Sequence, residues 1–585
     1  MARGMIVKLS DYIVSPLAMG TQANYKCVKE GQTRLCTYTG KWNLPEPFVA
    51  SMIDDDLLDA ACAESNIAGE YTKFERMAIL AASRALQRIP IRPADKEVLF
   101  ILSTTKGNIG ILDERWRGTY PPSRVLLTET AKQITRWFHN PNTPLVVCNA
   151  CISGLSAQVE AVRALESGLY RYVVVIGADE LSPFIVSGFQ SLKALSDSRC
   201  RPFDEDRTGL NLGEAAACIV YGCAAEGSEE ARESWHITCS AVRNDAFHTS
   251  TPSKTAEGAC AALKQVLSGQ KLSELAFVNL HGTATLFNDE MEAVALDRMG
   301  LGSLPANGLK GYFGHTLGAS GVLETLISME AVDDHTILTT KGFEALGVSR
   351  KINVSNRHRQ TDGRAFLKMM AGFGGCNSAL IFEKGEEVSP KHQAAHRTSF
   401  DITHTVKITP REVVVDGVQL AVTSAGISML KDLYHTCVGD YPKFYKMDPL
   451  CKLGFIASEL LLEAEAKTEG VARFSGCDDR AVVFVGRSAS LCADWLYQQT
   501  IQHADDYFPS PSAFIYTLPN ILTGEIAIRN QYHGETLYLS QDSPQAVTRL
   551  MEQVLSSPGT TSVIGGWIEI ANTDEFEANI SIIRK

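Results

Sequence analysis

Apolar runs of strand length alternate along the chain with stretches in which apolar residues recur at the spacing of a helix. In residues 71–89 and 153–169 the apolar positions fall three or four residues apart, which predicts two helices. Because strands that alternate with helices build layered sheets, this pattern predicts an α/β fold. The runs that we predict to be buried strands are 97–105, 144–150, 172–180, 215–222, 275–282 and 378–384.

A break in this pattern divides the chain. Residues 386–405 lie in a polar stretch that has no apolar periodicity and contains Pro390, which is typical of a linker. A strand-like segment follows, and we assign residues 406–585 to a separate domain, called the tail below.

Four segments of the tail resemble four earlier segments in the same order. The repeated order predicts an internal duplication, although buried α/β segments also look alike in general. The last of the four is a strand-like run, after which we expect the tail to end. The pairs are 74–86 with 450–462, 97–105 with 481–489, 121–130 with 510–519 and 173–180 with 562–569.

Composition excludes several classes of protein. The chain has 585 residues and a net charge of −12, which argues against general attraction to nucleic acid. No run approaches the ~20 apolar residues of a membrane helix, and Lys8 and Asp11 interrupt the apolar start, which argues against a signal peptide. Fifteen scattered cysteines without paired metal-ligand spacing predict a reduced protein in the cytoplasm with no metal site.

One predicted strand runs directly into two cysteines and a series of small residues. Cys148 ends the strand and Cys151 stands at the start of the helix that follows. A thiol at a helix start faces backbone N–H groups, so we expect the helix dipole to lower its pKa and favour the thiolate. By itself, a buried cysteine is also a small apolar side chain, and Cys148 fits that role better than Cys151 does.

Three further segments combine glycine turns with polar side chains at strand ends. Two histidines and a lysine at such junctions indicate a reaction centre more strongly than one histidine would. The residues concerned are His281, Thr283, Thr285 and Asp289 in the first segment, Lys310, His315 and Glu324 in the second, and Phe373 in the third.

Together these motifs resemble those of the β-ketoacyl synthase family of thiolase-fold condensing enzymes. The resemblance covers about residues 1–385 and implies a layered α/β/α/β/α fold, with an N-terminal half at 1–235 and a C-terminal half at 236–385. The tail then corresponds to an α/β half-thiolase domain. The matching motifs are NACISG (149–154), HGTATLFNDEME (281–292), KGYFGHTLGASG (310–321) and GFGGCNSA (372–379).

The resemblance implies a role for each candidate residue. Cys151 resembles the acyl-accepting nucleophile, and His281 and His315 resemble the two histidines of the elongating branch. Lys310 and Glu324 resemble the pair that orients the histidines, although an ordinary buried ion pair has the same appearance. Phe373 resembles the gating phenylalanine, whose backbone N–H forms an oxyanion site with that of Cys151. Thr283 and Thr285 resemble the hydroxyls that bind the phosphopantetheine arm, although they could instead stabilise the start of a helix. Asp289 corresponds to a structural residue near the site.

The activity that these roles imply is the decarboxylative condensation of an acyl chain on Cys151 with malonyl-acyl carrier protein. The pathway would be of fatty-acid, polyketide or aryl-polyene type. The implied partner is an acyl carrier protein, whose phosphopantetheine carries the substrates, and no other cofactor is implied. Five basic residues are candidates for binding the acidic carrier: Arg115, Arg117, Lys193, Arg199 and Arg201.

Alternatives remain open at this point. The chain could be a non-catalytic scaffold or chain-length factor, or a Cys-His acyltransferase or thiolase, for which Cys376 would be the second cysteine. The tail has Asp542, or a near neighbour, in the place of the nucleophile, so we expect no active site there. It resembles a chain-length factor and either occupies the position of a second protomer, giving an internal pseudo-heterodimer, or awaits a separate second half. A homodimer is a further possibility.

Overall fold

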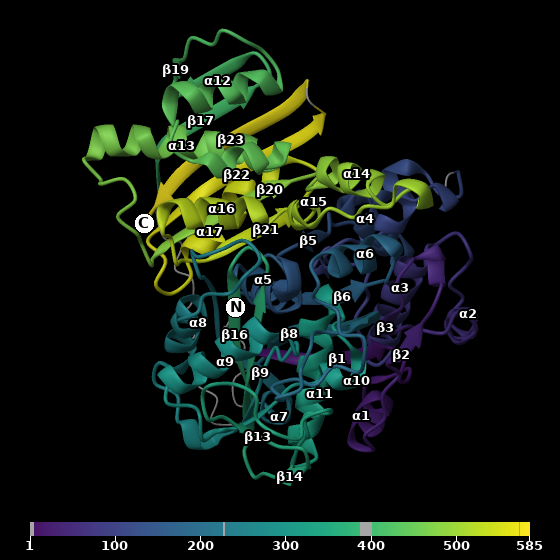
Figure 1. Cartoon of the computed structure of the whole chain (residues 1–585). Coiled ribbons are helices and arrows are strands. Elements are labelled where there is room, and N and C mark those ends of the chain that lie inside the picture. The colour runs from purple at the N-terminus through teal and green to yellow at the C-terminus, as the bar shows by residue number, and fades with distance from the viewer. Residues whose placement is uncertain (1–4, 117, 226–227, 386–399, 573) are drawn as a thin grey trace.

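The computed structural model describes residues 5–116, 118–225, 228–385, 400–572 and 574–585. Its main strands form three five-stranded units with the same strand order (Figure 1). In each unit the spatial order is third, second, fourth, fifth, first; the first two pairings are parallel and the last two antiparallel. Unit 1 contains β1 (Met5–Val14), β4 (Val98–Ser103), β5 (Leu145–Val147), β6 (Tyr172–Asp179) and β8 (Ala215–Ala224); unit 2 contains β9 (Trp235–Asn244), β10 (Leu275–Asn279), β11 (Pro305–Asn307), β15 (Ala365–Gly372) and β16 (Cys376–Lys384); unit 3 contains β17 (Asp401–Thr409), β20 (Arg480–Gly486), β21 (Thr536–Ser540), β22 (Ser562–Asn572) and β23 (Glu575–Arg584).

Units 1 and 2 stack with helices outside and between them. On the outer face of unit 1, α3 (Lys73–Leu86) packs on β1, β6 and β8, and on that of unit 2, α8 (Glu257–Leu267) packs on β9 and β16. Between the sheets lie α5 (Ser153–Glu166) and α11 (Ser320–Asp333), which contact each other and strands of both units. The result is the predicted α/β/α/β/α layering, and each predicted strand and both predicted helices are confirmed in position.

The duplication predicted from the sequence is present in the structure, and it is larger than expected. The four segment pairs occupy equivalent positions, for example α3 with α13 (Pro449–Glu469) and β4 with β20. The prediction that the tail ends after residues 562–569 is wrong, because β23 follows and supplies the fifth strand of unit 3. The alternating pattern of β23 marks a strand that is buried on one face only, which differs from the continuous apolar runs that we used to find strands.

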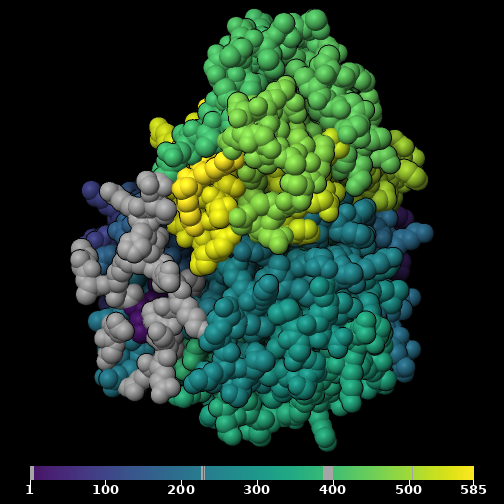
Figure 2. All heavy atoms as spheres, turned by 90° about the vertical axis from the view of Figure 1, so that its left-hand side faces the viewer, coloured from purple at the N-terminus to yellow at the C-terminus, as the bar shows by residue number. Residues whose placement is uncertain are grey.

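Unit 3 joins unit 1 edge to edge. The edge strand β21 pairs antiparallel with the equivalent edge strand β5, with Leu539 opposite Val147 and Ser540 opposite Val146. Equivalent strands that pair with each other in this way are related by an approximate two-fold axis, as in an isologous dimer. One apolar cluster continues across the junction and includes Val146 and Tyr538. Figure 2 shows the tail, green to yellow, as a cap on the teal body of the first two units.

Equivalent helices of units 1 and 3 differ in their surroundings. In α5, every residue from Ser153 to Leu165 is buried, because the helix lies in the middle layer. In its counterpart α17 (Val547–Leu555), only one apolar face is buried, and Thr548 and Arg549 are exposed. The polar outer face of α17 leaves no apolar surface that would require a second half-domain to cover it.

The junctions between the units lie near the predicted boundaries. Strand β9 begins at Trp235, next to the predicted boundary at residue 236. Residues 386–399 of the predicted linker lie outside the described residues. Strand β17 begins at Asp401, so unit 3 starts before residue 406, because the final residues of the predicted linker pair with the C-terminal strand β23.

None of the helices in the described ranges is both long enough and apolar enough to cross a membrane.

Candidate active site

Cys151 lies between β5 and α5, in the one-turn helix η5 (Ala150–Ile152). Ala150 has a φ of 49°, in the left-handed region that few residues other than glycine adopt, so the chain turns sharply there. Ser153 holds the turn: its Oγ accepts the N–H of Asn149 at 2.8 Å and donates to the carbonyl of Ala150 at 2.6 Å. The turn presents Cys151, half-buried, to a cavity.

The two histidines reach the same cavity from unit 2. His281 follows β10, and His315 precedes η7 (Leu317–Ala319) and α11. The starts of α5 and α11 approach closely at Gly154 and Gly321, where a Cβ on Gly154 would lie 2.8 Å from the Gly321 Cα. As a result, the Cys151 Sγ and one ring nitrogen of each histidine lie within 4.8 Å of one another.

The environment of the histidines keeps both rings neutral. The Nδ1 of His315 accepts the N–H of Leu317 at 3.2 Å, so the ring proton lies on Nε2, which has no partner among the described residues. Burial lowers the pKa of both imidazoles well below the usual value, and the Lys310 ammonium lowers it further. His315 therefore supplies an unpaired Nε2–H donor beside the thiol.

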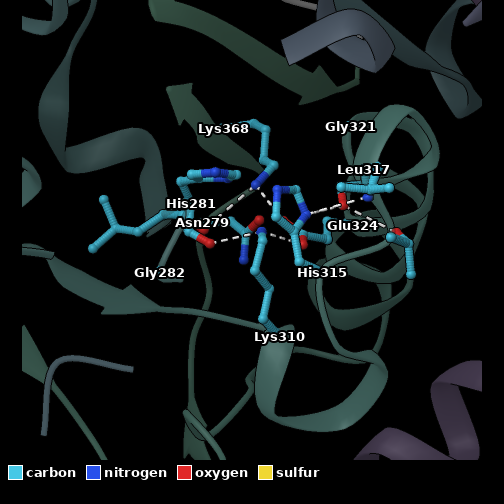
Figure 3. A network of polar contacts seen from close by, with 12 residues as sticks. Asn279, His281, Gly282, Lys310, His315, Leu317, Gly321, Glu324 and Lys368 are labelled. Atoms are coloured by element: carbon cyan, nitrogen blue, oxygen red, sulfur yellow. Dashed lines mark hydrogen bonds and ion pairs between the residues drawn. The ribbon is translucent and has the colours of Figure 1, made fainter. Parts of the chain in front are cut away.

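Two lysines share one carboxylate behind the histidines. Glu324 accepts from Lys310 at 2.7 Å and from Lys368 at 2.6 Å, and Lys310 also donates to the carbonyl of His281 at 2.7 Å. Figure 3 shows the two lysines meeting at Glu324 beside the histidine rings. Burial raises the pKa of Glu324, but the two ammonium groups outweigh it and hold this pKa below its usual value. The surplus positive charge disfavours a divalent cation at the Cys-His-His trio, although these residue types also bind Zn²⁺.

Lys368 was missed by the sequence analysis. It lies fully buried in β15, opposite Asn279, which is the last residue of β10 and precedes His281 by two residues. The signal was present, since a lysine within the apolar run AFLKMM needs a buried anion. Its ammonium contributes to the low pKa of both histidines, after burial and Lys310.

We expect Lys368→Met to change the pH dependence of the site. Removal of one positive charge raises the pKa of His281 and His315, so their protonation and the loss of activity begin at a higher pH. For the malonyl decarboxylation that the sequence resemblance implies, the acidic limb of the pH–rate profile should therefore move to higher pH, while Lys310 still pairs with Glu324. Lys384→Met, at a partly exposed ion pair with Asp333, is the matched control. An unchanged acidic limb in Lys368→Met contradicts this electrostatic role.

Carboxylates at the start of α9 (Leu286–Arg298) hold the loop that carries His281. Glu292 accepts the N–H groups of His281 at 2.6 Å and Gly282 at 2.8 Å. Asp289, which we expected to support the site, accepts the N–H groups of Phe203 at 2.7 Å and Ala284 at 3.1 Å. The role of Glu292 was not predicted, because its spacing also suits a carboxylate that stabilises a helix start.

The cavity has a volume of about 320 Å³. Thr283 and Thr285 line it with their hydroxyls 2.8 Å apart, and the Thr285 side chain makes no capping bond to α9. Lys310, Glu324 and Asp289 are not part of the lining and lie behind it. The predicted site residues that line the cavity are Cys151, His281, His315, Thr283, Thr285 and Phe373.

The predicted lowering of the Cys151 pKa is wrong for this structure. Burial raises the pKa of the thiol to about 12, and the Lys310 ammonium and the backbone N–H groups of Cys151 and Phe373 counteract it only in part. At the N-terminal start of α5, the loss of solvation raises the pKa of the thiol by more than the helix dipole lowers it. The thiol is therefore protonated at neutral pH.

Comparison with known proteins assigns the family. The family models for the β-ketoacyl synthase N-terminal domain and C-terminal domain match residues 49–221 and 236–344. Residues 49–344 belong to the β-ketoacyl synthase family. The matched ranges contain Cys151 and both histidines, and they end before the tail.

Two curated relatives of this region have names of different kinds. The putative mitochondrial 3-oxoacyl-[acyl-carrier-protein] synthase of Schizosaccharomyces pombe is 25% identical over 419 residues, which cover 63% of this chain and 97% of that protein. The tetracenomycin polyketide synthase ketoacyl synthase alpha subunit of Streptomyces glaucescens is 29% identical over 388 residues, covering 57% of this chain and 89% of that protein.

Solved structures extend the similarity of fold to the tail. The PfaC keto synthase–chain length factor matches with a TM-score of 0.76 at 13% identity. The match covers 100% of this chain and 78% of the PfaC chain. A ketosynthase (ApeO) in complex with its chain length factor (ApeC) from Xenorhabdus doucetiae has a TM-score of 0.57 at 22% identity, covering 65% of this chain and 98% of that chain. These identities establish similarity of fold.

The position of Cys151 has a counterpart in unit 3 that is a near neighbour of Asp542. The one-turn helix η10 (Pro544–Ala546) precedes α17 as η5 precedes α5, so Gln545 occupies the position of Cys151. Asp542, the residue named from the sequence, instead lies 2.7 Å from the Lys132 ammonium of unit 1. The equivalence of the two one-turn helices shifts the position by three residues from the sequence match.

The basic residues proposed for carrier binding differ in their surroundings. Lys193 lines the ketosynthase cavity. Arg199 donates to the carbonyl of Leu35 at 3.2 Å, Arg201 donates to Asp204 at 2.8 Å, and Arg115 pairs with Asp113. Arg117 lies outside the described residues.

Proposed function

We propose that this chain catalyses the decarboxylative condensation of an acyl chain on Cys151 with malonyl-acyl carrier protein, giving a β-ketoacyl-acyl carrier protein. The main support is the closeness of the Cys151 Sγ to ring nitrogens of His281 and His315, within 4.8 Å at one cavity. The reaction needs a nucleophile that holds the acyl chain and two donors for an enolate oxygen. The names of the relatives include both a 3-oxoacyl-acyl carrier protein synthase and a polyketide synthase subunit, so fatty-acid, polyketide and aryl-polyene-type pathways are the candidates.

The first half of the reaction transfers the acyl chain. The Cys151 sulfur attacks the thioester carbonyl, and the backbone N–H groups of Cys151 and Phe373 stabilise the resulting oxyanion. The C–S bond to the carrier then breaks, and the pantetheine sulfur leaves with the proton that the Cys151 thiol gives up. Because burial keeps this thiol protonated, proton transfer must accompany the attack.

The second half forms the carbon–carbon bond. The malonyl thioester loses CO₂, and the electron pair of the broken bond forms an enolate. The Nε2–H of His315 and a ring N–H of His281 donate to the enolate oxygen, which neutral rings can do without losing a charge. The α-carbon then attacks the acyl group on Cys151, the C–S bond breaks, and the sulfur takes up a proton.

The substrates would reach this site on the phosphopantetheine arm of an acyl carrier protein. Thr283 and Thr285 are the proposed contacts of the arm, since both line the cavity. Lys193 is the proposed basic contact of the acidic carrier. The chemistry described uses residues of this chain and the carrier-bound thioesters, with no added cofactor.

Two measurements test the proposed activity against its rivals. Mass spectrometry after incubation with acyl-carrier protein detects an acyl adduct on Cys151, and headspace analysis detects CO₂ from malonyl-carrier protein. A condensing enzyme gives both, a Cys-His acyltransferase gives the adduct without CO₂, and a scaffold gives neither.

The proposed role of the tail is that of an internal partner. Strand β21 occupies the edge of β5, and the polar face of α17 requires no second half-domain. The proteins of similar fold include a ketosynthase in complex with its chain length factor. We therefore favour a pseudo-heterodimer within one chain over a relic that awaits a separate partner, with units 1 and 2 as the two ketosynthase halves.

We expect the protein to be monomeric in solution. The tail covers the sheet edge through which two copies of unit 1 would pair, so the surface for a homodimer is occupied. Light scattering coupled to gel filtration should give the mass of one chain over a wide range of concentrations. A mass of two chains at every concentration would contradict the proposal that the tail occupies the dimer surface of unit 1.

A further inference from the structure

The turn between β15 and β16, residues 372–375, contacts both the ketosynthase site and the tail. We call it the gate loop. On the ketosynthase side, the N–H of Phe373 faces the Cys151 sulfur and lowers its pKa. The carbonyl of the same residue accepts the Cys376 thiol at 3.2 Å and also meets the tail.

Asn520 of the tail binds this carbonyl. Its side chain is almost fully buried at the start of α16 (Ile521–Asn530), and its Nδ2 donates to the Phe373 carbonyl at 2.7 Å. The contact depends on a close approach of the two backbones: a Cβ on Gly524 of α16 would lie 2.6 Å from the Gly374 carbonyl oxygen. A side chain at either glycine would push the helix and the gate loop apart.

The gate loop is also held from the ketosynthase side. The N–H of Gly374 donates to the carbonyl of Thr249 at 2.6 Å, so the peptide that joins Phe373 and Gly374 is bound at both ends. Asn244 donates to the Gly374 carbonyl at 2.8 Å and to the hydroxyl of Thr536 of the tail at 3.0 Å.

The Phe373 ring is linked to the tail as well. It stacks on Phe189 with ring centroids 6.3 Å apart, and Phe189 meets Phe514 of the tail edge to face at 5.5 Å. Backbone and ring of Phe373 are therefore both placed with the help of unit 3.

We infer that Asn520 is a positioning residue of the condensing site, supplied by the tail. The inference rests on the proposed function. An oxyanion donor acts only when its N–H is aimed at the place where charge develops, and a displacement of about 1 Å can cost ~10²-fold in rate. By fixing the carbonyl of Phe373, Asn520 fixes the backbone whose N–H serves the acyl transfer at Cys151. The tail thus helps to place an oxyanion donor of the condensing site, in addition to covering the ketosynthase.

The test compares two variants of Asn520 with a control on the same helix. Asn520→Ala removes the donor, and Asn520→Asp replaces it with an acceptor that repels the Phe373 carbonyl. Asn530→Ala is the control, because Asn530 is equally buried in α16 and its Nδ2 bonds only Ile526 of the same helix among the described residues. Acylation of Cys151 by acyl-carrier protein is followed by rapid-quench mass spectrometry, and CO₂ release from malonyl-carrier protein in parallel.

We expect the acylation rate constant to fall about 10-fold in Asn520→Ala and further in Asn520→Asp, within the range for a misplaced oxyanion donor. The KM for the acyl carrier and the rate of CO₂ release should stay near wild type, since these depend on the cavity entrance and the histidines. Wild-type acylation rates in both Asn520 variants overturn the inference. Equal losses in Asn520→Ala and Asn530→Ala, or parallel losses of both activities, also overturn it by indicating a structural role. Failure of the proposed function is distinct, since it would appear in the wild-type protein itself, which would then lack the acyl adduct, the release of CO₂, or both.

Discussion

Cys151→Ala is expected to abolish the acyl adduct and to lower condensation by on the order of 10⁴-fold, as loss of a catalytic nucleophile does in other enzymes. The variant keeps the one-turn helix η5, because Ser153 and Asn149 form its hydrogen bonds without the thiol. Mass spectrometry of the protein after incubation with acyl-carrier protein measures the adduct, and product analysis with malonyl-carrier protein measures condensation.

The control for this prediction lies three residues upstream. Cys148 is fully buried at the end of β5, and its Sγ lies 3.5 Å from the carbonyl of Thr105, away from the cavity lining. Cys148→Ala should keep the adduct on Cys151. An adduct that persists in Cys151→Ala would move the nucleophile elsewhere, and its mapping to Cys376 would favour a thiolase-like reaction.

His281→Ala and His315→Ala are each expected to lower the release of CO₂ from malonyl-carrier protein by about 10²–10³-fold, the typical effect of removing one donor to a developing oxyanion. Both rings are neutral and lie beside the thiol, so each variant loses a hydrogen-bond donor and no positive charge. Headspace measurement of CO₂ gives the rate.

Acylation of Cys151 separates this role from a general disturbance of the site. The oxyanion of acyl transfer is assigned to backbone N–H groups, so both histidine variants should still acquire an adduct. Unchanged CO₂ release in both variants would remove the histidines from the proposed mechanism and leave an acyltransferase.

Much of the fold and the chemistry could be predicted from short segments of sequence. The strands and helices follow from apolar spacing, and the places of Cys151 and His281 follow from polar residues at the ends of apolar strands. His315 follows from a glycine-rich turn that leads into a helix. These signals are local, since a strand end or a glycine turn is encoded by neighbouring residues. The internal duplication was also visible, because equivalent buried segments keep similar apolar patterns.

Other features depend on contacts between distant segments. The partner of Lys368 and the contact of Asn520 with Phe373 each join residues far apart in the chain. Glu292 is only 11 residues from His281, but its contact depends on how the loop folds back onto α9. The fifth strand of unit 3 became evident only from strand pairing, and the position of Gln545 only from the equivalence of the one-turn helices η5 and η10.

The sequence by itself determined the layered α/β elements, the duplication and the three reactive side chains. Only the tertiary structure decided their protonation and their partners. Desolvation of the Cys151 thiol raises its pKa, and this effect outweighs the local helix dipole, from which we predicted the opposite shift. The same holds for the tail, whose function depends on which edge of unit 1 it covers, and pairing between strands nearly 400 residues apart leaves no local pattern.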